Sequence, residues 1–268
     1  MRLHNKNKNS NNNKAAHLVY DGSFEGLLSA VFVAYEEKVQ PLTITTEIHA
    51  LPDFFNETIE VFTDETKAER VWKGLSKYST FRQQCYRSFL TEIPESGLVI
   101  FQAIRYVLQT GNDKDYGEKN VLQLAQWTKM VGRERHRMEA FVRFQLTKDG
   151  IYFAQIEPDF NVLPVLEKHF KSRYADQRWI VYDLKRGYGL YYDLTTVTVM
   201  TLDLSENKSS TENIFAEAEA DYSALWQNYF KSSNIKSRIN LKLHTRHVPK
   251  RYWKYLNEKL PDYSTRKK

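Results

Sequence analysis

Apolar side chains at helical spacing mark the first structured part of the chain. One set recurs at intervals of three and four residues and predicts the buried face of a helix: Phe24, Leu27, Leu28, Val31 and Phe32. A short apolar run at 17–21 precedes this set and predicts a strand, with Asp21 or Ser23 as the helix cap. The pattern therefore indicates a strand followed directly by a helix.

The chain from 41 to 141 is mostly helical in pattern. A weak alternation at 41–48 predicts a second strand, and we expect the stretch that follows it to be a connecting loop. Helical spacing then runs from 63 to 141 and is interrupted near Ser79, at 94–97 and at 111–120. These breaks predict about four helices.

Between residues 141 and 202 the spacing of apolar residues changes from helical to the two-residue alternation of a strand. Val142, Phe144 and Leu146 alternate with more polar positions, and further short strands follow at 151–157 and within 178–202. Because the runs are separated by tight turns, we expect an antiparallel sheet of about five strands. One helix, at about 161–174, crosses between the second and third strands.

A last amphipathic helix is predicted at 212–230. Its apolar stripe comprises Phe215, Ala218, Tyr222, Leu225, Trp226 and Tyr229. The chain has no internal repeat and no long Gly/Ser linker, so one α+β domain at 17–268 is the simplest organisation. It combines a helical N-terminal half, a central sheet with a crossing helix, a C-terminal helix and a basic segment at 231–268. The Asn/Lys-rich residues 1–16 are expected to be a disordered polar tail.

Composition excludes several classes of protein. The 268 residues are 41% hydrophobic, which is enough for a sizeable core. They contain no run of 18 apolar residues and no signal peptide, so we expect a cytoplasmic protein that does not enter a membrane. Cys85 is the only cysteine, which excludes disulfides, Cys-rich zinc sites and iron–sulfur clusters. The common nucleotide-binding and hydrolase motifs are absent, and no cofactor or metal is predicted.

Charge is concentrated at the two ends. The formal net charge is +6, yet residues 231–268 hold twelve basic and two acidic side chains, and residues 1–20 hold four basic and none acidic. The stretch between them is therefore net acidic. A basic terminal segment is typical of polyanion binding, most simply of nucleic acid.

The densest polar cluster is GRERHRMEAFVRF at 132–144. On a continuous helix Arg133, His136 and Arg137 lie opposite the core positions, and Arg143 follows on the outer face of a strand. Arginine forks suit phosphate oxygens, and an exposed imidazole can donate to phosphate or act as a base. The alternative is a solvated face on which these cations pair with Glu134 and Glu139.

A second cluster follows the sheet's second strand. Glu157 and Asp159 flank a proline, and Asn161 is positioned to cap a helix that carries His169 and Arg173. The two carboxylates, with His136 or His169, are candidates for acid–base or metal chemistry. The alternative, which we favour, is that they form ion pairs with the arginines of the first cluster.

The C-terminal segment interleaves cations with aromatic rings. Arg246, Lys250 and Arg251 can neutralise phosphates, and Tyr252 and Trp253 can stack on unpaired bases. The same aromatic residues can equally dock the segment onto the rest of the protein, leaving the cations outside.

Several long motifs in one order resemble an uncharacterised bacterial family associated with DNA metabolism and repair. They are YDGSFEGLLSAVFVAYE at 20–36, KAERVWKGL at 67–75, GRERHRMEAFVRF, IEPDFNVLP with HFKSRYADQRW, and PKRYWKYL at 249–256. The resemblance implies a partner, a radical-SAM protein similar to spore photoproduct lyase. Some family members carry a fused uracil-DNA glycosylase domain, which we do not expect here because the chain ends soon after PKRYWKYL. The family's catalytic residues are not established, so the resemblance implies a DNA context and no site.

Three functions remain open from the sequence. The first is a DNA-binding accessory protein for DNA repair or modification, acting with the radical-SAM partner. Its phosphate-binding surface would comprise Arg133, His136, Arg137, Arg143, Arg173, Arg178 and the C-terminal residues Arg246, Lys250, Arg251, Tyr252 and Trp253. The second is a nucleic-acid or nucleotide-processing enzyme that uses Glu157, Asp159 and His136 or His169. The third is a protein–protein adaptor without DNA contact.

Overall fold

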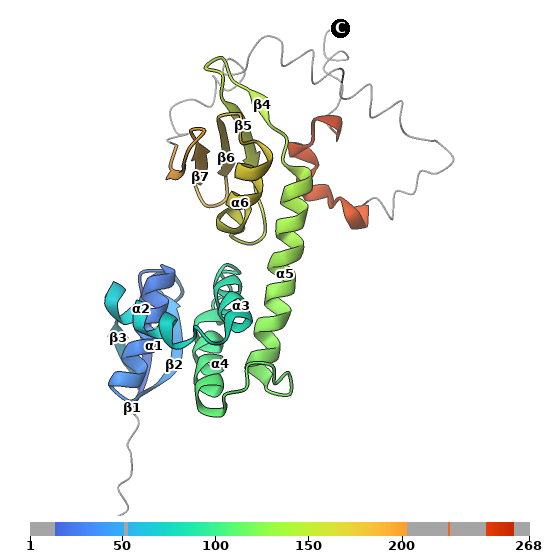
Figure 1. The fold of residues 1–268 in the computed structure, drawn as a ribbon. Coiled ribbons are helices and arrows are strands. Elements are labelled where there is room, and N and C mark those ends of the chain that lie inside the picture. The colour runs from blue at the N-terminus through green and yellow to red at the C-terminus, as the bar shows by residue number, and fades with distance from the viewer. Residues whose placement is uncertain (1–13, 51–52, 203–224, 226–244, 260–268) are drawn as a thin grey trace, which may run out of the picture. The chain divides into compact units, whose positions relative to one another are not determined.

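The computed structural model describes residues 14–50, 53–202, 225 and 245–259, and its chain divides into two compact units, Met1–Val131 and Gly132–Lys268 (Figure 1). Each unit combines helices with a sheet, which confirms the predicted α+β class. The single-domain organisation stays a prediction. The helix expected at 212–230 lies outside the described residues except for Leu225, and so does most of the expected polar tail.

The N-terminal unit is built on a parallel sheet with the strand order β2-β1-β3. Its strands are β1 (Lys14–Tyr20), β2 (Val39–Thr46) and β3 (Glu57–Glu60). Helix α1 (Phe24–Glu36) links β1 to β2, because parallel neighbours require a crossover. Ser23 caps α1 as predicted, accepting a hydrogen bond from the Gly26 amide at 2.8 Å.

Two strand boundaries in this unit differ from the prediction. Strand β1 begins at Lys14, inside the expected tail, and β3 lies in the stretch expected to be a loop. The sequence of β3, ETIE, has too few apolar positions to predict a strand. Pairing of β3 with β1 stabilises it, so tertiary context decides its conformation.

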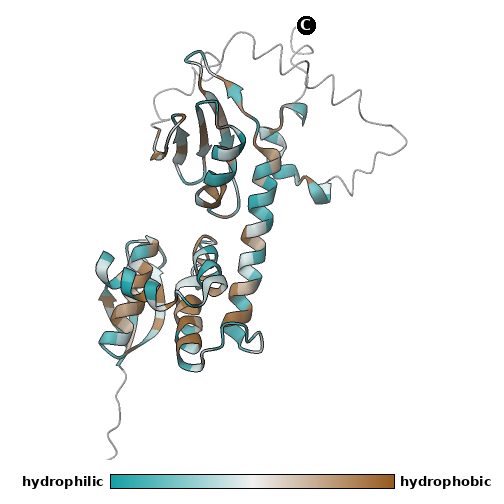
Figure 2. Ribbon diagram, in the orientation of Figure 1, coloured by the Kyte–Doolittle hydropathy of each residue, from teal (hydrophilic) through white to brown (hydrophobic). Residues whose placement is uncertain are grey.

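The four helices predicted between 63 and 141 are confirmed. They are α2 (Glu65–Gly74), α3 (Ser79–Phe89), α4 (Ser96–Thr110) and α5 (Lys119–Phe141), and a short η1 (Glu47–His49) precedes them. Side chains such as Leu18, Leu27, Phe81 and Ile104 form the core between these helices and the sheet. Figure 2 shows α4 mostly hydrophobic and the second half of α5 mostly hydrophilic. In the described part of the chain, no helix is both long and apolar enough to span a bilayer.

The C-terminal unit contains the predicted five-stranded sheet, in the order β4-β5-β6-β7-β8. Its strands are β4 (Gln145–Leu146), β5 (Tyr152–Ile156), β6 (Trp179–Asp183), β7 (Tyr188–Tyr192) and β8 (Val197–Met200). The crossing helix is α6 (Leu163–Arg173), and it makes β5 and β6 parallel while the other pairs are antiparallel. Two short 3-10 helices, η4 (Lys250–Tyr255) and η5 (Asn257–Lys259), follow.

Two local predictions in this unit are wrong. The strand expected at 141–146 is reduced to the two residues of β4, because α5 continues to Phe141 and the Val142 amide still donates to the Met138 carbonyl at 3.1 Å. Asn161 does not cap α6. The N-cap residue is Val162, and the Asn161 side chain instead accepts a hydrogen bond from the Tyr188 hydroxyl at 2.5 Å.

Two helical glycines are expected to respond oppositely to alanine. A Cβ at Gly26 would lie 2.2 Å from Asp21 Oδ1 and 2.8 Å from Thr63 Oγ1, whereas a Cβ at Gly132 meets nothing within 4 Å. We expect Gly132→Ala to raise the free energy of unfolding by about 0.5–1 kcal/mol through helix propensity alone. Gly26→Ala is expected to lower it by about 1–3 kcal/mol through overpacking. Urea unfolding of both variants measures this, and equal shifts of the same sign would contradict it.

Candidate functional site: a cationic surface at the turn after β5

The turn at 157–161, which links β5 to α6, is where three other parts of the C-terminal unit meet. The second half of α5, the turn between β6 and β7, and η4 all form hydrogen bonds or ion pairs with it. The turn contains both carboxylates singled out in the sequence, Glu157 and Asp159. Its contacts therefore decide what these carboxylates do.

Glu134 of α5 is the buried centre of these contacts, with 1% of its side chain exposed. It lies on the buried face of α5, in line with Val131 and Met138. Its Oε1 accepts hydrogen bonds from the Asp159 amide at 2.9 Å and from the Tyr252 hydroxyl. Its Oε2 accepts a hydrogen bond from Arg137 Nη1 at 3.2 Å. A buried carboxylate is tolerated only with partners of this kind.

Two residues of η4 complete the surroundings of Glu134. Arg251 Nη2 lies 3.6 Å from Glu134 Oε2 and 2.5 Å from Asp159 Oδ2, so one guanidinium bridges two carboxylates. Tyr252 is buried, with its ring 5.6 Å from that of Phe141. Burial and the hydrogen bond to Glu134 raise the pKa of Tyr252, which keeps its hydroxyl a neutral donor.

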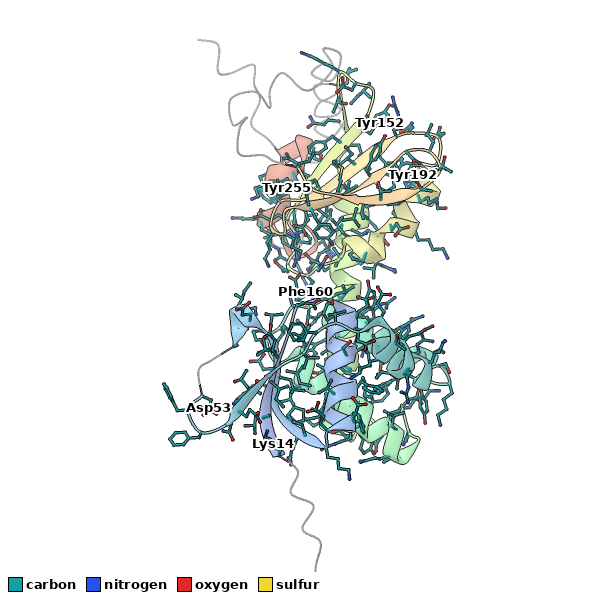
Figure 3. All side chains as sticks on the ribbon, turned by 90° about the vertical axis from the view of Figure 1, so that its left-hand side faces the viewer. Lys14, Asp53, Tyr152, Phe160, Tyr192 and Tyr255 are labelled. Atoms are coloured by element: carbon teal, nitrogen blue, oxygen red, sulfur yellow. The ribbon has the colours of Figure 1, made fainter. Side chains whose placement is uncertain are left out.

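Glu157 forms a separate contact with η4. It pairs with Lys254 and accepts a hydrogen bond from the Tyr255 hydroxyl at 2.7 Å (Tyr255 is labelled in Figure 3). These two contacts, that with Lys254 foremost, lower the pKa of Glu157 below its ordinary value. Burial, together with the same hydrogen bond, raises the pKa of Tyr255 to about 12. Glu157 is therefore held as a carboxylate that anchors η4.

The turn between β6 and β7 binds the 157–161 turn from another side. Arg186 Nη1 lies 2.8 Å from the buried Asp183 carboxylate and donates to the Pro158 carbonyl at 3.2 Å. Lys185 Nζ donates to the Asp159 carbonyl at 3.2 Å. These cations thus bind backbone carbonyls of the 157–161 turn.

The acid–base candidates from the sequence are not brought together by these contacts. Glu157 and Asp159 each form an ion pair, as expected, but the predicted partners are wrong: the cations are Lys254 and Arg251 of η4 and not the arginines of the first cluster. His136 and His169 instead lie beside Glu139, with their Nδ1 atoms 3.6 Å and 3.9 Å from its carboxylate oxygens. Within the described ranges, no three His, Cys, Asp or Glu side chains are grouped so that they could hold a metal ion.

Several predicted phosphate-binding residues are engaged in internal contacts. Arg143 pairs with Glu258 at 2.8 Å and donates to the Ala140 carbonyl near the end of α5. Arg178 makes a long hydrogen bond of 3.4 Å to the Asp149 carbonyl, and the guanidinium of Arg173 lies over the Tyr174 ring. Trp253 donates from Nε1 to the Val248 carbonyl at 3.0 Å.

Three other predicted cations are exposed and have no ion-pair or hydrogen-bond partner within the described ranges: Arg133, Arg246 and Lys250. Arg133 precedes Glu134 in α5, and Lys250 precedes Arg251 in η4. One such cation thus directly precedes each member of the Glu134–Arg251 pair in the sequence. Since neither is tied to a carboxylate in the described part of the chain, both can bind an anion from solution.

A family model described as a domain of unknown function, DUF4130, matches residues 94–258. This chain belongs to the DUF4130 family. The matched region runs from just before α4 to Glu258, so it includes the 157–161 turn and every partner described above. No curated protein and no solved structure matches the chain.

Four side chains of the site were not predicted to contact the 157–161 turn: Lys185, Arg186, Lys254 and Tyr255. Their roles depend on contacts between segments up to 98 residues apart, which spacing along the chain does not reveal. Glu134 did carry a signal. It lies three residues after Val131 and four before Met138, on the core face, where an acidic side chain requires a partner.

Tyr252→Phe tests the Glu134 contact. Removing the hydroxyl deprives a buried carboxylate of a donor, so we expect the free energy of unfolding to fall by about 2 kcal/mol. Tyr191→Phe serves as the control, because Tyr191 is half-buried and its hydroxyl has no partner within the described ranges. A loss no larger in Tyr252→Phe than in Tyr191→Phe, measured by urea unfolding, would show that the contact contributes nothing.

The Glu157 contacts predict a dependence on pH. Because the pKa of Glu157 is lower in the folded protein, its contribution to stability is complete above the unfolded value near 4.5 and is lost as the pH falls through the folded value. We expect wild type to be more stable than Glu157→Gln at pH 7 and the difference to shrink below pH 4.5. Urea midpoints across this range measure the effect, and a difference independent of pH refutes it.

Proposed function

We propose that this protein binds DNA through the cationic surface around the 157–161 turn, as an accessory protein in DNA repair or modification. The observation that carries the proposal is a pair of exposed cations, Arg133 and Lys250, that have no partner within the described ranges and directly precede Glu134 and Arg251 in the sequence. Phosphate groups are the anions that such exposed cations attract most strongly on a protein surface.

The charges around the turn support this proposal. Four carboxylates are present, and each is matched by at least one cation: Glu134, Glu157, Asp159 and Asp183. Five cationic side chains contact these acids or the backbone of the turn: Arg137, Lys185, Arg186, Arg251 and Lys254. Arg133 and Lys250 adjoin Glu134 and Arg251 in the sequence and add a positive surplus. A surplus that remains after pairing attracts phosphate without first breaking an internal ion pair.

The contacts also divide the roles of the C-terminal residues. Tyr252, which is buried, and Trp253, which donates to a backbone carbonyl, hold η4 in place in this proposal. Phosphate binding then falls to Arg246 and Lys250, together with Arg133 of α5. Because the backbone of η4 is already held by its ion pairs, binding through Lys250 costs side-chain freedom but little backbone freedom, which favours affinity.

Any reaction is assigned to a partner in this proposal. The resemblance implies a radical-SAM protein, whose iron–sulfur cluster needs several thiolates. This chain offers one, Cys85, which is fully buried, and burial raises the pKa of its thiol. The proposed protein therefore presents DNA to the partner and does not carry out the chemistry itself.

Salt-dependent DNA binding tests the proposal. We expect the full chain to bind a short duplex in a fluorescence anisotropy titration and its affinity to fall steeply with salt. Arg133→Ala/Lys250→Ala is expected to reduce the slope of log affinity against log salt by about 1.8, roughly 0.9 for each lost phosphate contact. A single strand of the same sequence should show which form is preferred.

The control removes the same charge from elsewhere in the C-terminal unit. Lys148→Ala/Lys168→Ala eliminates two exposed lysines that lie outside the cluster, and we expect the slope to stay within experimental error. Absence of binding at low salt would overturn the proposal and favour the adaptor without DNA contact. Equal effects of the two double variants would overturn the assignment to this surface.

A further inference from the structure

Two phenylalanine side chains in the N-terminal unit are almost completely exposed. Phe54 and Phe55, which precede β3, have relative exposures of 94% and 95%. Large apolar side chains that are exposed together are typical of interaction sites, because water solvates them poorly. Neither residue belongs to the family match or to the cationic surface described above, so the proposed function does not account for them.

Hydrogen bonds to Asp53 anchor the turn that carries these rings. The Asp53 carboxylate accepts from the Phe55 amide and from Asn56 Nδ2, both at 2.8 Å, and contacts His17 Nε2 on β1 at 2.9 Å. These hydrogen bonds lower the pKa of Asp53, that from Asn56 most, so its carboxylate stays charged. The two rings are therefore presented by an anchored turn, which reduces the entropy lost when they are buried.

The charges beside the rings favour one kind of partner. Glu57 follows the turn and pairs with Lys14 of β1, and both side chains are about half exposed. Figure 3 shows Lys14 and Asp53 at the same end of this unit. Asp53, Glu57 and Glu60 disfavour DNA or an anionic membrane at this place. Lys14 and Glu57, which border the two rings, instead give the surface one charge of each sign. Such a surface can face a second copy of itself, because each charge then meets its opposite, as a twofold interface requires.

We propose that Phe54 and Phe55 form the centre of a symmetric interface with a second copy of this chain. In this arrangement the four rings pack together across a twofold axis, and Lys14 of each copy faces Glu57 of the other. Each phenylalanine buries roughly 150–250 Å², so the rings remove about 600–1,000 Å² from water. This area is smaller than that of a standard interface, so the dimer is expected to be weak and to depend on concentration.

Sedimentation velocity of the full chain between about 1 and 200 µM tests the interface, a range in which micromolar dimers dissociate. We expect wild type to pass from monomer to dimer and Phe54→Ser/Phe55→Ser to weaken dimerisation at least about tenfold. Val199→Ser is the control, because Val199 is an exposed apolar residue of the other unit. Circular dichroism checks that each variant is folded. Wild type that stays monomeric, or equal dimerisation of the double variant, overturns the proposal.

A charge exchange tests the twofold arrangement separately. Lys14→Glu and Glu57→Lys should each weaken dimerisation, because like charges then meet across the axis. An equimolar mixture of the two variants should recover it as a heterodimer, in which one copy supplies both anions and the other both cations. Repair within one chain cannot produce this recovery. If the mixture associates no better than the separate variants, the symmetric interface is wrong.

Discussion

Burial of the Glu134 carboxylate is the constraint on which the C-terminal unit depends. A charge that is removed from water costs several kcal/mol unless donors replace the lost solvent, and Glu134 draws its donors from three separate segments of the chain. These segments are its own helix, the turn after β5 and η4. The requirement to pair one carboxylate therefore fixes the position of the turn and of η4 together.

This constraint explains how the cationic surface arises. The arginines of the 132–144 cluster and the basic C-terminal segment are far apart in the sequence. Glu134, which lies within the cluster, brings them together because it pairs both with Arg137 and with Arg251 of η4. Once Arg251 has paired with Glu134 and Asp159, its neighbour Lys250 remains exposed. The positive surface is thus what is left over after the ion pairs needed for folding have formed.

Sequence reasoning succeeded for elements whose conformation depends on neighbouring residues and failed for those that depend on contacts between distant segments. Helical spacing located α1 and the four helices up to 141, and period-two alternation located the five-stranded sheet, because each depends on neighbouring residues. It missed β3, whose pairing with β1 stabilises four residues of weak strand character, and it placed a strand where α5 continues to Phe141. In the site it named Arg133, Arg251 and Lys250, but it did not predict that Lys254 and Tyr255 contact Glu157, because only folding brings these residues together.

The hydrogen bond between Tyr252 and Glu134 joins residues 118 positions apart. As a consequence, η4 is part of the cooperative folding unit and not an appendage to it. A protein cut before Lys250 would keep α5 and the whole sheet, yet it would leave Glu134 without its tyrosine and Asp159 without its arginine. The chain must therefore be synthesised as far as η4 before the C-terminal unit reaches its final stability. Proteolysis at this point would destabilise a helix that lies more than a hundred residues upstream.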